Sequence, residues 1–114
     1  DTGEVELGLE RSKEAPVGSR VRVKIRKLPS GEVEFEVDGR NLAKGDYDIV
    51  VAGKRLGALN MVEADGRTEG ETEFETTPND SDELALPFDP SGQAVEIKQA
   101  GRVFFSGMVP TPIV

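Results

Sequence analysis

Residues 20–26 and 32–38 both alternate strictly between charged and hydrophobic side chains. Alternation with a period of two puts the two kinds of side chain on opposite faces of a β-strand. Pro29 and Ser30 suit the centre of a tight turn, and Gly31 suits the left-handed residue that follows it. We predict an antiparallel hairpin whose exposed face carries a basic row, Arg22, Lys24 and Arg26, beside an acidic row, Glu32, Glu34, Glu36 and Asp38. Its buried face would carry Val21, Val23, Ile25, Val33, Phe35 and Val37.

Shorter strand-like runs recur through the rest of the chain. They lie at about residues 4–10, 47–51, 56–62, 71–76, 84–88, 95–97 and 103–105, and turn residues separate them at the roughly 8–12-residue spacing of sandwiches and barrels. No window of about eleven residues or more has the 3.6-residue period of an amphipathic helix. We predict one all-β domain over residues 1–114, a Greek-key β-sandwich of immunoglobulin-like or prealbumin-like type with seven to nine antiparallel strands.

Composition excludes several classes of partner. The net charge of −8 disfavours nucleic acid and anionic membranes, which both require a basic surface. No run approaches the roughly 20 apolar residues that a membrane-spanning helix needs. We therefore expect neither a nucleic-acid partner nor membrane insertion.

Residues 42–47 read Leu-Ala-Lys-Gly-Asp-Tyr and precede an apolar strand. This run resembles the tyrosine corner of Greek-key sandwiches, so we expect Tyr47 to be buried with its hydroxyl bonded to the backbone near residues 42–45. Together with Gly57 and residues 86–92, residues 42–51 resemble uncharacterised all-β domains of secreted bacterial proteins. The resemblance implies an extracellular or cell-surface location and implies no activity.

Catalytic chemistry has little support in the sequence. The chain has no His and no Cys, so the usual general base and the best nucleophile are both missing, and no Ser lies in a nucleophile elbow. The glutamates at 32, 34 and 36 could supply a carboxylate pair for glycoside hydrolysis, but a solvated strand face explains them better. We expect no enzyme activity and no catalytic residue.

Calcium is the one cofactor for which the sequence offers ligands. Asp80, Asp82 and Glu83 cluster in a polar loop, and calcium accepts carboxylate and carbonyl oxygens together. A solvated acidic turn is the alternative interpretation. A carbohydrate-directed module is a further alternative, although the chain has no Trp for a sugar to stack on.

The N-terminal run offers a route to assembly. Val5, Leu7 and Leu9 alternate with polar residues, and a polar loop at 11–19 separates them from the next strand. Such a strand could complete a neighbouring copy's sheet, and repetition of that step would build a filament. The alternative is an edge strand of the chain's own domain. We expect a non-enzymatic extracellular structural or adhesive module, with copies of itself as partners in a fibre or surface assembly.

Overall fold

The computed structural model describes residues 3–78 and 83–112, and all regular structure in those ranges is β-strand. The strands are β1(Gly3–Gly8), β2(Glu10–Arg11), β3(Arg20–Lys27), β4(Val33–Arg40), β5(Gly45–Val51), β6(Lys54–Ala64), β7(Arg67–Glu75), β8(Glu83–Ala85), β9(Ala94–Gln99) and β10(Arg102–Met108). The expected all-β, largely antiparallel fold is confirmed. In the described part of the chain, no helix is long and apolar enough to cross a membrane.

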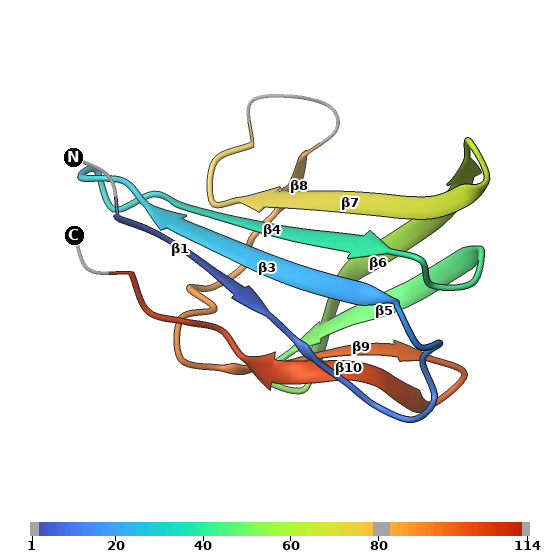
Figure 1. Ribbon diagram of the computed structural model, residues 1–114. Coiled ribbons are helices and arrows are strands. Elements are labelled where there is room, and N and C mark those ends of the chain that lie inside the picture. Colours follow the sequence, from blue (N-terminus) through green and yellow to red (C-terminus); the bar gives the residue numbers. More distant parts are fainter. Residues whose placement is uncertain (1–2, 79–82, 113–114) are drawn as a thin grey trace.

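The strands form one continuous sheet that curls into a nearly closed barrel (Figure 1). The order is β1-β3-β4-β7-β6-β5-β9-β10-β2, and β8 lies parallel to β7. On one side β6 joins the two halves, because its first residues pair with β5 and its last ones with β7. On the other side the N-terminal strand joins them, since β1 pairs with β3 and β2 with β10.

The predicted hairpin is confirmed in register and in orientation. β3 pairs with β4 so that Arg22, Lys24 and Arg26 lie opposite Asp38, Glu36 and Glu34, and each pair forms an ion pair. All six hydrophobic side chains expected on the inner face are buried. Glu32 precedes β4, and its carbonyl accepts a hydrogen bond from the Leu28 amide in the turn.

Three further hairpins use two-residue turns in which both residues have positive φ. The turns are Ala52-Gly53, Asp65-Gly66 and Ala100-Gly101. Such turns match the right-handed twist of the strands they connect, and glycine adopts positive φ at no steric cost. These local signals account for β5–β6, β6–β7 and β9–β10 being neighbours.

Hydrophobic side chains from both halves of the barrel fill its interior. Phe35 of β4 packs against Phe74 of β7 with ring centroids 5.9 Å apart. Tyr47 of β5 meets Phe104 of β10 edge to face at 5.3 Å. The core therefore ties strands that are distant in the sequence.

The tyrosine-corner interaction is present. Tyr47 is 1% exposed, and its hydroxyl donates a hydrogen bond of 2.8 Å to the carbonyl oxygen of Ala43. Leu42, at the start of the same run, is also buried. The expected burial and backbone bond of Tyr47 are both confirmed.

Tyr47→Phe is expected to lower the free energy of unfolding by about 1 kcal/mol, because the variant keeps the ring and strands the Ala43 carbonyl. Chemical denaturation of the two chains under identical conditions measures the difference. An unchanged midpoint would show that the corner does not stabilise the fold.

Candidate functional site

Two acidic rows lie side by side on the outer face of the sheet. β4 pairs with β7 so that Glu34 lies opposite Glu75 and Glu36 opposite Glu73. The basic row of β3 lies on the other side of β4, with the acidic residues of β1 beyond it. Like charges directly opposite each other destabilise a sheet, so these glutamate pairs weaken the β4–β7 contact, although Arg26 and Lys24 of β3 form ion pairs with Glu34 and Glu36.

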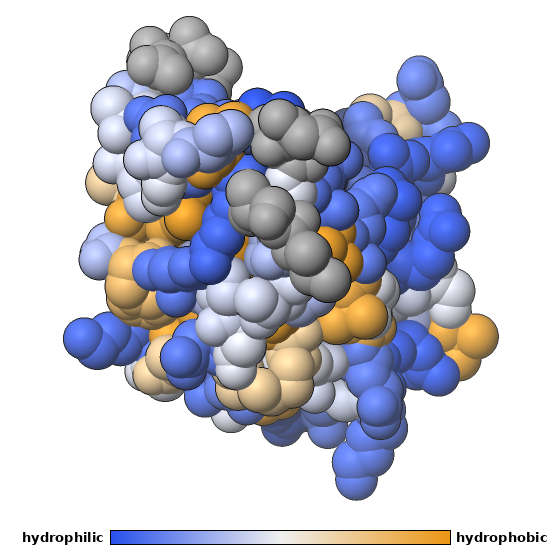
Figure 2. Space-filling model, turned by 90° about the vertical axis from the view of Figure 1, so that its left-hand side faces the viewer, coloured by the Kyte–Doolittle hydropathy of each residue, from blue (hydrophilic) through white to orange (hydrophobic). Residues whose placement is uncertain are grey.

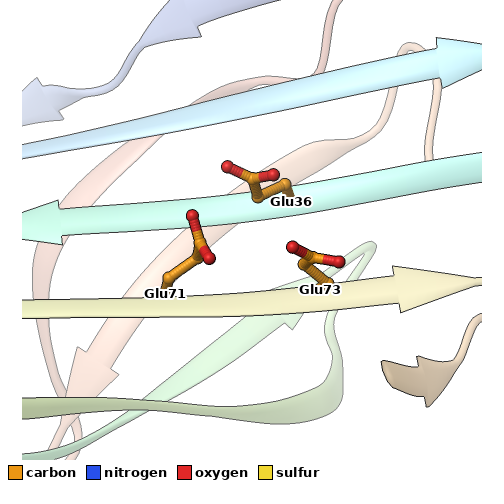
Figure 3. A group of neighbouring side chains, drawn as sticks. All are labelled: Glu36, Glu71 and Glu73. Carbon is orange, nitrogen blue, oxygen red and sulfur yellow. The ribbon is translucent and has the colours of Figure 1, made fainter. Parts of the chain in front are cut away.

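Four glutamates of these rows and Glu83 of β8 form two overlapping groups, which we call the carboxylate cluster. Carboxylate oxygens of Glu36, Glu71 and Glu73 lie within 4.8 Å of one another, and the three side chains point toward a common space above β4 and β7 (Figure 3). The second group, Glu73, Glu75 and Glu83, meets the same limit. A hollow of about 240 Å³ above these strands is lined by four of the five.

Proton affinity in the cluster is raised. A hydrogen bond with Glu83, partial burial and the charges of Glu83 and Glu34 raise the pKa of the Glu75 carboxyl to about 7. Desolvation followed by the charge of Glu71 raises the pKa values of Glu36 and Glu73, and Lys24 opposes both shifts. A pKa of about 7 leaves the Glu75 carboxyl partly protonated at neutral pH, where an isolated glutamate would have lost its proton.

The structure brings one of the predicted calcium ligands into this cluster. Glu83, at the start of β8, lies opposite Glu73 across the β7–β8 pairing. Asp80 and Asp82 lie outside the described residues. Glu36, Glu71, Glu73 and Glu75 were not predicted as metal ligands, although the alternating acidic rows at 34–38 and 71–75 are visible in the sequence.

A cluster of this kind can bind a divalent cation or exchange protons. Calcium takes six to eight oxygen ligands, many of them from carboxylates, and such an ion would neutralise the like charges. Sugar stacking has no comparable support, because among the described residues the aromatic rings are buried or packed against the core.

The predicted assembly residues lie in the N-terminal segment that pairs with both β3 and β10, with Val5 and Leu7 in β1 and Leu9 between β1 and β2. Val5 is half-buried, Leu7 is exposed and Leu9 is buried. The Leu9 amide donates to the Val21 carbonyl of β3, whereas the Ser12 amide donates to the Phe104 carbonyl of β10. Backbone groups alternate in direction along a strand, so those of Glu4, Glu6 and Gly8 point away from β3.

The barrel stays open beyond β2. Continuing the Ser106–Glu10 register would place Pro110 opposite Glu6 and Pro112 opposite Glu4. Proline has no N–H, so neither residue can donate to β1. Val109, immediately before Pro110, donates its amide N–H to the Gln93 carbonyl, which lies on the opposite side from β1. We call the interval between β1 and residues 107–112 the seam.

Exposure of Leu7 confirms that the seam is uncovered. Leu7 belongs to the inward-facing series with Val5 and Leu9, and its cross-strand partner Val23 is fully buried. Leu7 nevertheless exposes 39% of its surface. An inward-facing leucine is left this exposed because, among the described residues, no strand pairs with β1 on the side away from β3.

The fold and these two features define an all-β domain with a nearly closed barrel, a carboxylate-rich outer face and an open seam. No model of a protein family matches the sequence, and no curated protein and no solved structure is significantly similar to it. Functional inference therefore rests on the residues of this chain.

The raised pKa values of Glu36, Glu73 and Glu75 predict that the folded protein becomes less stable as the pH rises. A carboxyl whose folded pKa exceeds its unfolded value binds more protons in the native state, so its stabilising contribution is lost as pH rises through the folded pKa. For Glu75 that window extends from about 4.5 to about 7. The melting temperature is expected to be several degrees higher at pH 5 than at pH 8, measured by circular dichroism at constant ionic strength.

Variants locate the effect. Glu75→Gln should raise the melting temperature at pH 8 and flatten its dependence between pH 5 and pH 8, because the neutral amide can still bond to Glu83. Glu63→Gln removes one negative charge from an exposed position in β6 and should leave the dependence unchanged. Equal pH profiles for wild type and Glu75→Gln would contradict the assignment.

Proposed function

We propose that this chain is a non-enzymatic structural or adhesive module of an extracellular assembly, and that other chains join it by strand addition at the free edge of β1. The observation that supports this proposal is the seam. Backbone groups of Glu4, Glu6 and Gly8 face it, and strand addition supplies partners for such groups. The extracellular location rests on the sequence resemblance.

The sequence predicts strand donation by the run at about residues 4–10 as one route to a filament, but donation would require breaking the pairings of β1 with β3 and of β2 with β10. Accepting a strand at the seam breaks none of the strand pairings among the described residues. We therefore propose acceptance as the main form of assembly. We also propose the finer architecture, a Greek-key sandwich, on the strength of the tyrosine corner.

Single-cysteine variants test the proposal, because the chain has no cysteine of its own. Glu6→Cys places a thiol at the seam, and Glu63→Cys places one on the exposed part of β6 as a matched control. Cells that make each variant are treated with a membrane-impermeant cross-linker that carries a maleimide and a sulfonated N-hydroxysuccinimide ester, so that the new thiol is joined to an amine of a neighbouring chain. Cross-links to another chain from position 6 and none from position 63 are expected. Absence of cross-links from both positions would contradict the proposal.

Calcium binding is a second candidate function, because the carboxylate cluster contains Glu83 together with four further glutamates. An ion shared by both groups would contact Glu73, which belongs to each. In this case the module's binding to its ligand, or its stability, would depend on calcium.

Calcium is expected to raise the melting temperature by several degrees, since an ion present at about 100 times its dissociation constant stabilises by about 2.7 kcal/mol. Thermal melting in millimolar Ca²⁺ and in chelator measures the shift. Glu73→Gln should abolish it and Glu63→Gln should not. Identical melting of the wild-type chain in calcium and in chelator would remove calcium as a ligand.

A further inference from the structure

We propose that the seam accepts an extended strand of a different protein in which basic residues alternate with branched apolar residues. This inference specifies the partner for the assembly described above and therefore rests on that proposed function. Three properties of β1 support this inference. They are the direction of the backbone groups that face the seam, the apolar surface left uncovered beside β1 and the charge of its outer face.

The inner side of the seam calls for apolar residues. Val5 and Leu7 face inward, yet Val5 is only half-buried and Leu7 is exposed. Figure 2 views the molecule from the side on which β1 begins, and it shows hydrophobic patches among the hydrophilic residues of that surface. An added strand with Val, Ile or Leu at alternate positions would cover Val5 and Leu7, in the way that β3 covers them on the other side.

The outer side of the seam calls for basic residues. Glu4 and Glu6 are exposed on the outer face of β1, and Glu4 lies opposite Arg26 and Glu6 opposite Lys24 of β3. Glu6 also makes an ion pair of 3.7 Å with Arg22. A basic row on the seam side would give β1 an oppositely charged neighbour on both sides. The chain's net charge of −8 would in addition attract a basic partner over a distance.

A second copy of this chain does not provide such a strand. Pairing β1 with β1 of another copy would set Glu4 and Glu6 against the same acidic pair, and like charges disfavour that contact. Within the described residues, the basic–apolar alternation occurs in β3, which is already paired on both sides, with β1 and β4. The partner is therefore a different protein.

A direct test uses the full chain and fluorescent seven-residue peptides, with fluorescence anisotropy as the measurement. The first peptide alternates Lys with Val, the second alternates Glu with Val, and the third has the composition of the first in an order that does not alternate. The Lys–Val peptide is expected to bind one per chain and at least tenfold more tightly than either other peptide. Equal binding of the scrambled peptide would overturn the inference.

Charge reversal locates the site. The double variant Glu4→Lys and Glu6→Lys should weaken binding of the Lys–Val peptide at least tenfold and should now bind the Glu–Val peptide. A control with the same net charge, Glu71→Lys and Glu73→Lys, alters the carboxylate cluster and should keep the wild-type preference. If the Glu71→Lys and Glu73→Lys variant lost Lys–Val binding and the Glu4→Lys and Glu6→Lys variant kept it, the peptide would be bound at the carboxylate cluster. That result would overturn the inference.

Glu6→Pro tests the backbone part. It removes an N–H that faces the seam and leaves the β1–β3 ladder intact, so it should weaken Lys–Val binding while thermal melting shows a folded chain. Unaltered binding would overturn strand addition.

If position 6 cross-links to a partner in cells but the Lys–Val peptide does not bind, the assembly stands and the partner chemistry proposed here is wrong. If the peptide binds but position 6 gives no cross-link, the proposed assembly is wrong.

Discussion

Deleting residues 1–12 is expected to lower the free energy of unfolding by about 3 kcal/mol or more, a large share of the about 5–15 kcal/mol typical of a domain. The deletion removes the strand that pairs with β3 and β10 and so joins the two halves of the barrel. It also exposes the inner side of β3, where Val21 and Val23 are at most 1% exposed. Urea denaturation followed by circular dichroism measures the loss.

Two point variants separate loss of packing from loss of the strand. Leu9 is 8% exposed, so Leu9→Ala should cost about 2–3 kcal/mol, near the lower end for a buried leucine. Leu7 is 39% exposed, so Leu7→Ala should cost distinctly less. If the chain lacking residues 1–12 is as stable as the full chain but no longer assembles, the strand is donated to a neighbour and does not close its own barrel.

Gly70→Ala is expected to destabilise the protein by about 2–3 kcal/mol, in the upper part of the range of about 1–3 kcal/mol for overpacking. A Cβ at Gly70 would overlap the carbonyl oxygen of Asn60 and lie 3.0 Å from the Met61 sulfur. The first of these is backbone, so β6 itself would have to move. Because β6 passes from one half of the barrel to the other at this point, the movement would disturb both halves.

Gly8→Ala provides the matched control. Gly8 also lies in a strand, but a Cβ there would meet no atom within 4 Å. Its stability should change by less than about 0.5 kcal/mol, as for ordinary surface substitutions. Similar losses for the two variants in urea denaturation would show that the close approach at Asn60 does not govern the stability of the barrel.

The sequence by itself determined the local structure of this protein. Alternation at 20–26 and 32–38, with a turn ending in Gly31, settled the β3–β4 register because a shift by one residue would bury charges and expose Val and Phe. The run ending at Tyr47 predicted its burial and backbone bond. Each of these signals is contained within about 20 residues of chain, where turn geometry and side-chain period act together.

Tertiary structure alone decided the two candidate sites. Period-two alternation shows that Glu36 and Glu73 face outward, but it does not show that β4 and β7 are neighbours, so their repulsion could not be foreseen. The sequence shows that Pro110 and Pro112 lack backbone N–H donors, but it does not show that β1 would face these two residues. Pairing between distant strands is settled by packing of the shared core, which carries no local signature in the sequence.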